Sequence, residues 1–460
     1  GAEPAAWHSG LSEKQRRRAW REVANGRARI VIGARSALFL PFQRLKLIIV
    51  DEEHDTSYKQ GEGVIYHARD LAVMRAKQEG GLVVLASATP ALESLVNAEA
   101  QRYQWLKLSN RPGRARLPEI HLVDLTRTPP EQGQALSPPL IRAMRTRYED
   151  GEQSLLFLNR RGYAPLVICK ACGERLKTPG TQSWLTEHRY TGRLICHVTG
   201  YSIPKPTACP HCQAAHSLVG IGPGVERVAE EVRQIFPDAR IEIFSSDTAT
   251  GRDNVTSLIE AMAAGEIDIL IGTQIVAKGH NFPKLTLVGV VDADTAMQGG
   301  DLRAGERTYQ LLLQVAGRAG RADRPGEAII QTYTPDNPAM QALKLGDRDG
   351  FMQIERDNRA AVGMPPFGRL AALIISGPDE AGLETFCKTI RAAAPLCEGL
   401  EIYGPAAPPL SVLRGRFRRR FLIQSRRDIN LSDYMAKWIS GIKPPASTRI
   451  AIDIDPYSFM

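Results

Sequence analysis

An acidic tetrapeptide is the part of this sequence best suited to chemistry. Asp51, Glu52, Glu53 and His54 follow directly after the apolar run 48–50. Acidic side chains at the carboxyl end of a buried parallel strand lie where α/β sheets bind ligands. Because ATP hydrolysis needs one carboxylate for Mg²⁺ and another to orient or deprotonate water, we predict that Asp51 holds the metal and Glu52 the water. The alternative is a polar strand end that faces solvent.

A second motif supplies small hydroxyl groups. Ser87 and Thr89 follow the apolar run 82–85, at the end of another expected strand. Such residues could link a nucleotide site to a neighbouring lobe. Ser-Ala-Thr alone is a common loop sequence, and its place after the acidic strand is what favours this role.

A third motif, residues 314–321, lies at the end of an amphipathic helical pattern. Arg318 and Arg321 are three residues apart and therefore share a helical face. Guanidinium groups suit the charge spread over a transferring phosphoryl group, so we predict two arginine fingers from a second lobe. The alternative is a solvated basic helix. Gly317 and Gly320 argue against it, because glycine costs helix stability and no structural return is evident.

A fourth motif follows the apolar run 267–271. Gly272 and Thr273, with Lys278 a few residues later, could present backbone amides and an ammonium group to phosphates. By itself this is a moderate signal.

Five of the seven cysteines lie between Cys169 and Cys212, which indicates a metal site in a reducing compartment rather than a disulfide scaffold. Cys169-x-x-Cys172 and Cys209-x-x-Cys212 are two knuckles with two thiolates each, and together they give a closed tetrahedral Cys₄ site. The remaining pair, Cys387 and Cys397, we interpret as plain buried thiols.

Elements that could position these residues alternate along the chain. Apolar, β-branched runs separated by helical patterns predict a parallel sheet buried on both faces. They occur at 28–33, 47–50 and 82–85, and again at 154–158, 241–244, 267–271, 287–291 and 328–333. The sequence therefore predicts an α/β fold with two lobes, 1–127 and 128–345, a Cys-rich insertion at 166–218 and a small α+β domain at 346–460.

Composition is that of a globular protein. The net charge of +9 points weakly toward a polyanionic partner, and no run of eighteen apolar residues or secretory signal is present. The chain starts without Met, which suggests a fragment.

The order of the motifs resembles that of superfamily 2 helicases. Residues 51–54, 87–89, 272–274 and 314–321 stand where motifs II, III, V and VI would be. Four longer segments narrow the resemblance to the PriA family of primosomal replication-restart helicases: 33–39, 51–60, 157–163 and 274–282. The resemblance to this family extends over essentially the whole chain. The Cys-rich insertion separates that family from other DExH translocases.

This resemblance implies two RecA-like lobes and an ATP-dependent 3′→5′ DNA helicase that recognises stalled or branched forks and helps to load the replicative helicase. The implied partners are forked and single-stranded DNA, single-strand DNA-binding protein, the replicative helicase and its loader, in the bacterial cytoplasm at the nucleoid and without a membrane. The catalytic residues would be Asp51, Glu52, His54, Gln314, Arg318 and Arg321. ATP and Mg²⁺ would be held by Asp51, Glu52, Ser87, Thr89, Gly272, Arg318 and Arg321.

Two departures from the family matter. The family's phosphate-binding loop, G-x-x-x-x-G-K-[ST], is not in this sequence, which contains no Gly-Lys pair. We therefore expect the chain as given to hydrolyse ATP feebly or not at all. The family also carries four Cys pairs and two zinc ions, with the outer knuckles paired.

Here the inner knuckles are replaced by residues 178–181 and 196–199, where only Cys196 remains. A threonine hydroxyl stays protonated near neutral pH and is a poor zinc ligand, so we expect one zinc ion. Cys196 with His188 or His197 is the less favoured route to a second site.

Expected DNA contacts combine aromatic stacking with basic groups on the phosphates. The candidates are Arg35, Tyr58, Lys59, Thr273, Lys278, Arg416 and Arg418. The run 414–420 packs five arginines around one phenylalanine, a density that costs self-repulsion unless an anion is near. An ordinary surface loop around Tyr58 and a solvated basic hairpin around Arg416 are the alternatives.

Two other protein classes compete with the helicase. A non-catalytic zinc- and DNA-binding scaffold is compatible with the missing phosphate loop. A restriction-type translocase is disfavoured by the Cys₄ insertion and the C-terminal domain.

Overall fold

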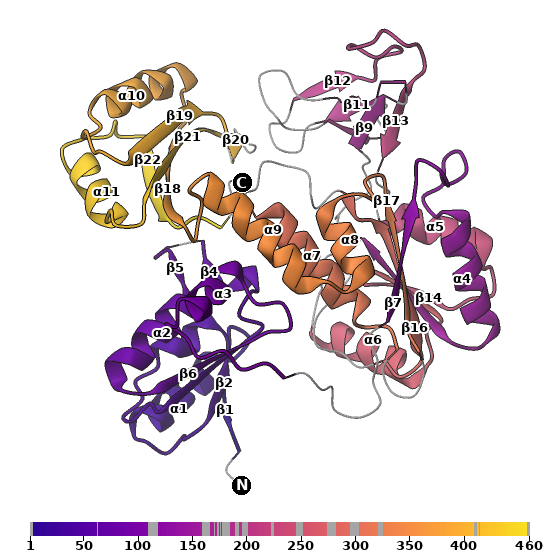
Figure 1. Cartoon of the computed structure of the whole chain (residues 1–460), viewed down its shortest axis with the longest axis horizontal. Helices are drawn as coiled ribbons and strands as arrows, with labels where there is room; N and C mark the ends of the chain where they lie inside the picture. Colours follow the sequence, from indigo (N-terminus) through magenta and orange to yellow (C-terminus); the bar gives the residue numbers. More distant parts are fainter. Residues whose placement is uncertain are drawn as a thin grey trace. The chain divides into compact units, whose positions relative to one another are not determined.

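The computed structural model divides into two compact units, Gly1–Trp105 (unit 1) and Leu106–Met460 (unit 2), as Figure 1 shows by colour along the chain. It describes residues 3–61, 63–108, 118–158, 166–169, 171–172, 174, 176, 185–188, 193–195, 201–221, 225–244, 252–273, 282–294, 303–320, 325–408, 412–413 and 415–457. No helix in these ranges has the length and apolar character needed to cross a membrane.

Unit 1 is built from short parallel pairs of strands and three α-helices. Strand β1 pairs with β2 and β3 pairs with β6, both in parallel, while β4 and β5 form an antiparallel hairpin. The elements are β1 (Ala5–Trp7), α1 (Glu13–Ala24), β2 (Val31–Gly33), η1 (Arg35–Phe39), β3 (Leu47–Asp51), η2 (Thr56–Tyr58), β4 (Lys59–Gln60), β5 (Tyr66–His67), α2 (Ala68–Glu79), β6 (Leu82–Ala86) and α3 (Leu92–Glu99). The expected strands at 47–50 and 82–85 are confirmed.

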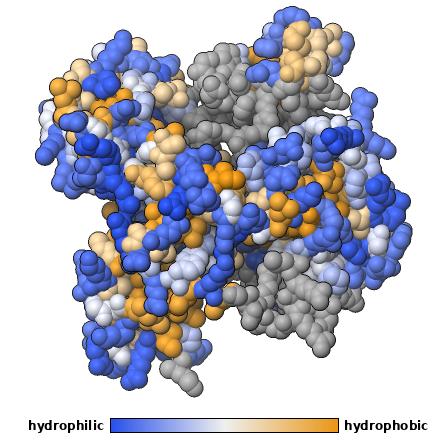
Figure 2. Space-filling model, in the orientation of Figure 1, coloured by the Kyte–Doolittle hydropathy of each residue, from blue (hydrophilic) through white to orange (hydrophobic). Residues whose placement is uncertain are grey.

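Burial of β3 and β6 on both faces, which the sequence predicted, is wrong for this structure. Ile49 is 64% exposed and Leu82 63%, whereas Val50 is 5% exposed. Side chains alternate between the two faces of a strand, and only the face of Val50 is covered. Figure 2 shows the resulting apolar surface, in orange, over unit 1.

A buried carboxylate, Glu53, ties the end of β3 to two helices. Its oxygens accept hydrogen bonds from Arg69 Nη1 (3.2 Å), from the Ala91 amide (2.7 Å) and from Ser94 Oγ (2.9 Å). Arg69 lies on α2, and the other two donors lie at the start of α3. Burial raises the pKa of Glu53, and the charge of Arg69 opposes that rise.

We expect Glu53→Ala to lower the free energy of unfolding of unit 1 by about 3–5 kcal/mol, because it removes the buried carboxylate that balances Arg69. Asp70→Ala is the matched control. Asp70 also pairs with Arg69 (Nε to Oδ1, 2.9 Å), but its side chain is 61% exposed, so its loss should cost less than about 1 kcal/mol. Hydrogen exchange of α2 and α3 in the full chain at increasing denaturant measures both, and equal losses would contradict the expectation.

Unit 2 is centred on a six-stranded, all-parallel sheet in the order β14-β15-β8-β16-β17-β7. In Figure 1, α4 and α5 lie on one side of this sheet and α7 and α8 on the other. Strand β8 is buried along its whole length. The elements are β7 (Glu119–Asp124), α4 (Pro138–Glu149), β8 (Gln153–Leu158), α5 (Val225–Ile235), β14 (Ile241–Phe244), α6 (Arg252–Ala264), β15 (Ile269–Gly272), β16 (Leu285–Asp292), α7 (Ala304–Ala316), β17 (Glu327–Thr332), α8 (Pro338–Leu345) and α9 (Arg348–Ala361).

All five strands expected in the second lobe are present in this sheet. Strand β7 was not expected: it adds to the sheet edge beside β17, so the boundary predicted at residue 127 lies beyond a strand of the second lobe. Helix α9, placed by the sequence in the C-terminal domain, packs against α7 and α8 of the same lobe.

A Cys-rich module interrupts the second lobe between β8 and α5. Its five strands form an antiparallel sheet in the order β12-β11-β10-β9-β13, around a small core that includes Val167, Leu194 and Leu218. The strands are β9 (Leu166–Cys169), β10 (Thr186–His188), β11 (Arg193–Ile195), β12 (Ser202–Pro204) and β13 (Leu218–Ile221).

The C-terminal domain is an α+β fold. Its antiparallel sheet has the order β19-β21-β18-β22, and two helices pack on one face around Phe386, Ile390 and Trp438. Cys387 is buried in this core, as predicted, whereas Cys397 is only half-buried. The elements are β18 (Gly368–Gly377), α10 (Glu380–Ala392), β19 (Leu400–Ala406), β20 (Val412–Leu413), β21 (Arg416–Arg426), α11 (Leu431–Ser440) and β22 (Arg449–Ile454).

Candidate nucleotide, metal and DNA sites

The acidic tetrapeptide forms a tight turn at the carboxyl end of β3. Asp51 is the last residue of the strand and is exposed. Glu52 adopts a left-handed φ of 48°, a sparsely populated conformation for a residue with a side chain, and its amide donates to Asp51 Oδ1 (3.0 Å). The two residues assigned to metal and water are therefore neighbours in one turn, at the strand end where α/β sheets bind ligands.

His54 connects this turn to the Ser-Ala-Thr motif after β6. Its Nδ1 lies 2.7 Å from Ser87 Oγ and its Nε2 lies 3.4 Å from Thr89 Oγ1. The same Nδ1 is 3.6 Å from a carboxylate oxygen of Glu52, and the His54 side chain is only 8% exposed. The second motif is thus in direct contact with the acidic turn through one nearly buried imidazole.

Two candidate DNA residues also contact this region. Tyr58 donates from its hydroxyl to the Asp51 carbonyl oxygen (2.7 Å), and Arg35 Nη1 donates to the Lys59 carbonyl oxygen (2.6 Å). Burial raises the pKa of Tyr58, and the charge of Asp51 adds to that rise. Tyr58 therefore contacts the acidic strand end directly, and Arg35 contacts the residue next to Tyr58. DNA binding by Arg35, Tyr58 and Lys59 stays a prediction.

Sequence reasoning gave Glu53 no role, although it stands among the four motif residues. Its neighbours Asp51 and Glu52 reach solvent while Glu53 points inward to Arg69. The partner of Glu53 is Arg69 on the next helix. The sequence alone does not show that Arg69 is buried beside Glu53, because this depends on where α2 packs.

In unit 2, the fourth motif begins at a buried strand end. Gly272 is the last residue of β15. Thr273 is only 2% exposed, so its side chain is not accessible to a DNA strand in this structure. Lys278 and Arg321 lie outside the described residues. Gln314 is half-buried on α7, and Arg318 is buried just beyond the end of that helix.

The prediction that the motif's glycines bring no structural return is wrong for Gly320. Gly317 is the C-cap of α7, with a right-handed φ of −62° that other residues also adopt. Gly320 has a left-handed φ of 70°, and a Cβ there would lie 2.2 Å from the Gly326 amide nitrogen. Glycine at position 320 is therefore required by the backbone itself. That Asp51 and Glu52 face Arg318 and Arg321 across a nucleotide stays a prediction.

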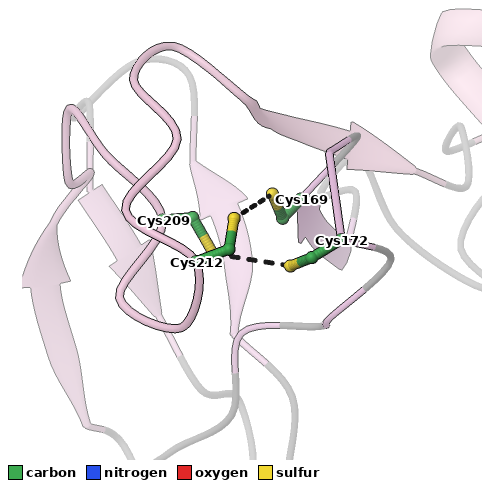
Figure 3. Close-up of side chains that lie close together, drawn as sticks. All are labelled: Cys169, Cys172, Cys209 and Cys212. Atoms are coloured by element: carbon green, nitrogen blue, oxygen red, sulfur yellow. Dashed lines mark hydrogen bonds between the residues drawn. The ribbon is translucent and has the colours of Figure 1, made fainter.

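The four thiols of the two CxxC knuckles converge, as Figure 3 shows. All four Sγ atoms lie within 4.8 Å of one another; Cys169 and Cys212 are 3.5 Å apart, and Cys172 and Cys209 3.9 Å. A tetrahedral zinc ion with Zn–S bonds of about 2.3 Å requires S···S separations of roughly 3.8 Å. The geometry of the thiols therefore fits a metal ion of this kind.

Local structure prepares these thiols for a metal. Cys169 ends β9, while Cys209 and Cys212 lie in the turn before β13, so the two knuckles meet across the antiparallel β9–β13 pair. The hydrogen bond with Ser217 (3.1 Å) lowers the pKa of the Cys169 thiol to about 6, whereas burial and the neighbouring thiols raise the pKa values of Cys172 and Cys212.

Most residues of the expected second, inner zinc site lie outside the part of the chain that the structure describes. Residues 178–181, Cys196 and His197 lie outside the described residues, and the His188 side chain is not described either. Among the described residues, the Cys₄ group is the one cluster of three or more potential metal ligands.

The basic run in the C-terminal domain lies on β21 and is more buried than its sequence suggests. Arg416 Nη2 donates to the Ser376 carbonyl oxygen (2.8 Å) and to that of Ser447. Arg419 pairs with Glu380 (2.7 Å) and Glu384 on α10, so part of the charge density has its anions within the domain. Arg418 is half-buried, and burial lowers its pKa.

Three family models match the chain. They are the DEAD/DEAH box helicase over residues 3–98, the helicase conserved C-terminal domain over 222–323, and the primosomal protein N C-terminal domain over 360–457. The replication restart protein PriA of Rickettsia conorii is 44% identical over 459 residues, which is 100% of this chain and 71% of that protein. PriA of Bacillus subtilis is 38% identical, with 100% of this chain and 58% of that protein covered.

Solved structures resemble the chain more distantly. RecG bound to a three-way DNA junction has 14% identity and a TM-score of 0.40, with 78% of this chain and 36% of that one covered. Mycobacterium smegmatis helicase Lhr bound to ssDNA and AMP-PNP has 15% identity and a TM-score of 0.39, with 74% and 37% covered.

Acidic and hydroxyl motifs at strand ends, an arginine beyond a helix of a parallel sheet, and two matching helicase domains define an α/β helicase with RecA-like lobes. The match to PriA relatives along the whole of this chain, and the matching C-terminal domain, narrow this class. The chain belongs to the PriA family of replication restart proteins.

Proposed function

We propose that this protein is the ATP-dependent 3′→5′ DNA helicase that recognises stalled or branched forks and helps to load the replicative helicase. The observation that carries the proposal is the contact of His54 with both Ser87 and Thr89 beside the Asp51–Glu52 turn. It supports a motor because an acidic hydrolysis site needs a physical connection to the parts that move.

At the nucleotide, each residue has a separate task. Asp51 is exposed at the end of β3 and would hold Mg²⁺, which neutralises charge on the phosphate oxygens. Glu52 would orient the attacking water and accept its proton. Arg318 and Arg321 would stabilise the charge that develops on the transferred group, and Gly272 and Gln314 would line the same site from the second lobe.

Coupling to DNA would run through the same turn. Tyr58 bonds the Asp51 backbone and Arg35 bonds the Lys59 backbone, so a strand bound at Tyr58 or Lys59 would shift the residue that holds Mg²⁺. Lys278 would contact the DNA strand from the second lobe, and Thr273 would do so only after a movement that uncovers its buried hydroxyl. In the C-terminal domain, Arg416 and Arg418 stay the proposed DNA- or partner-binding residues, and the guanidinium of Arg416 bonds the carbonyl groups of Ser376 and Ser447.

The Cys₄ module would hold one zinc ion through Cys169, Cys172, Cys209 and Cys212. Single-strand DNA-binding protein, the replicative helicase and its loader are the proposed protein partners. The proposed place of action is the bacterial cytoplasm, on nucleoid DNA. The proposed domains keep the Cys-rich insertion at 166–218, whereas the limits predicted at residues 127 and 345 are moved so that β7 belongs to the second lobe and α9 to its helical layer.

An ATPase assay with forked DNA tests the motor. This chain is compared with a version extended upstream to include a G-x-x-x-x-G-K-[ST] loop, which would cradle the β- and γ-phosphates. The extended version should hydrolyse ATP, more on forked than on duplex DNA, while the chain as given should be at least about 100-fold slower.

Equal hydrolysis by both versions would contradict the expected inactivity of the chain as given and would leave the helicase function in place. DNA binding by both without hydrolysis by either would favour the zinc- and DNA-binding scaffold.

A further inference from the structure

The residues after β22 are bound to α7 by two arginines. The Arg303 guanidinium carbon lies 4.2 Å from the centroid of the Tyr457 ring, and that of Arg307 lies 5.8 Å away. Arg307 also donates to the Tyr457 carbonyl oxygen, and Arg303 is buried. Cation–π contacts are strongest where the cation is removed from water. The contacts of Arg303 and Arg307 with Tyr457, here called the Tyr457 clasp, therefore hold the chain after β22 against α7.

Helix α9, which leads into the first strand of the C-terminal sheet, is also bound to α7. Arg359, in the last turn of α9 before β18, donates from Nη2 to Glu306 Oε2 of α7 at 2.6 Å, and both side chains are buried. Tyr309 of α7 stacks on Phe351 of α9, with ring centroids 4.6 Å apart and planes 21° apart. Helix α7 therefore binds the segments on both sides of the C-terminal sheet, α9 before it and Tyr457 after it.

The other end of α7 carries Arg318. The chain leaves the helix at Gly317, and two residues beyond Arg318 the Gly320 amide donates to the Leu285 carbonyl oxygen at the start of β16 (3.0 Å). Arg318 thus lies between a helix and a fixed point on the sheet. Because a packed interior transmits small displacements instead of absorbing them, a shift of α7 must be taken up at Arg318.

We infer that Tyr457 is a positioning residue for Arg318: its ring, held by Arg303 and Arg307, keeps α7 in the place that aims the Arg318 guanidinium at the nucleotide. The inference rests on the proposed ATPase function and adds to it a residue far from the chemistry. Because Tyr457 is bound to α7, a movement of the C-terminal sheet would displace α7. The C-terminal domain could in this way change the rate of ATP hydrolysis.

The test is a double-mutant cycle in the upstream-extended version. Tyr457→Ala should lower kcat of DNA-stimulated ATP hydrolysis roughly tenfold, with KM for ATP and DNA affinity within about twofold, because a displaced catalytic group costs rate more than binding. Tyr457→Phe keeps the ring and should match the parent. In an Arg318→Lys background, Tyr457→Ala should cause no further loss, since its effect acts through Arg318.

The outcomes separate positioning from general damage. If Tyr457→Ala lowers activity by the same factor in both backgrounds, or leaves kcat of an active parent unchanged, the inference is overturned while the proposed function stands. A parent without DNA-stimulated hydrolysis would overturn both. Hydrogen exchange on the chain as given supplies a readout without ATP: Tyr457→Ala should speed exchange across 304–316, and unchanged exchange there would also overturn the inference.

Discussion

Cys209→Ser is expected to reduce the zinc content from one ion per chain to none. Cys209 is buried in the Cys₄ group and lies 3.9 Å from Cys172, so its loss leaves three thiolates and a hydroxyl that stays protonated near neutral pH. Structural zinc is worth about 10–16 kcal/mol in small domains, which makes this the largest single effect that one side chain should have here. Elemental analysis after dialysis against a mild chelator measures it.

The same change should unfold much of the Cys-rich module. The described core of that module is small, with Val167, Leu194 and Leu218 among its members, and a zinc ion held by the knuckles would link β9 to the turn before β13. Hydrogen exchange across 166–169 and 218–221 should rise, while β8 in the parallel sheet stays protected. Cys397→Ser, which changes a half-buried thiol outside the group, is the control and should keep one zinc ion. Two tightly held ions in the parent protein would contradict the one-site expectation.

Glu52→Gln in the upstream-extended version is expected to lower kcat for ATP hydrolysis about 1,000-fold or more. The amide has nearly the shape of the carboxylate but cannot accept a proton from water, and general base catalysis contributes about 10²–10⁴-fold. The turn should survive, because its hydrogen bond to Asp51 is made by the Glu52 backbone amide. ATP and DNA affinities should therefore change little.

Steady-state kinetics with a parallel nucleotide-binding titration separates these effects. Glu13→Gln, on the exposed face of α1, changes the charge of unit 1 equally and should leave kcat unchanged. A Glu52→Gln variant that retains more than a tenth of the parent's kcat would remove Glu52 from the chemistry.

The strands that carry the motifs could be predicted because their signals are local. The runs at 47–50, 82–85 and 267–271 are apolar and largely β-branched, and each forms a strand of a parallel pair or sheet. The Cys₄ group could be predicted equally well, because two CxxC knuckles are typical of a metal site and the four thiols do lie together in the structure.

What the sequence did not reveal depends on partners that are distant along the chain. Arg416 looked like a free basic residue, yet its guanidinium bonds the carbonyl groups of Ser376 and Ser447. The apolar character of Ile49 predicted burial, but burial of a strand face depends on what covers it. The clasp on Tyr457 joins residues 150 positions apart, which no local pattern can indicate.

The placing of β7 has a consequence for how the protein is made. Strand β7 has its partner in β17, which is encoded about 200 residues later, beyond the Cys-rich module. At about 5–20 residues per second, a nascent chain would expose β7 for roughly 10 to 40 seconds before β17 is synthesised. The edge of the sheet would therefore be the last part to form, and a ribosome stalled before residue 327 should hold a lobe whose first strand is still protease-sensitive.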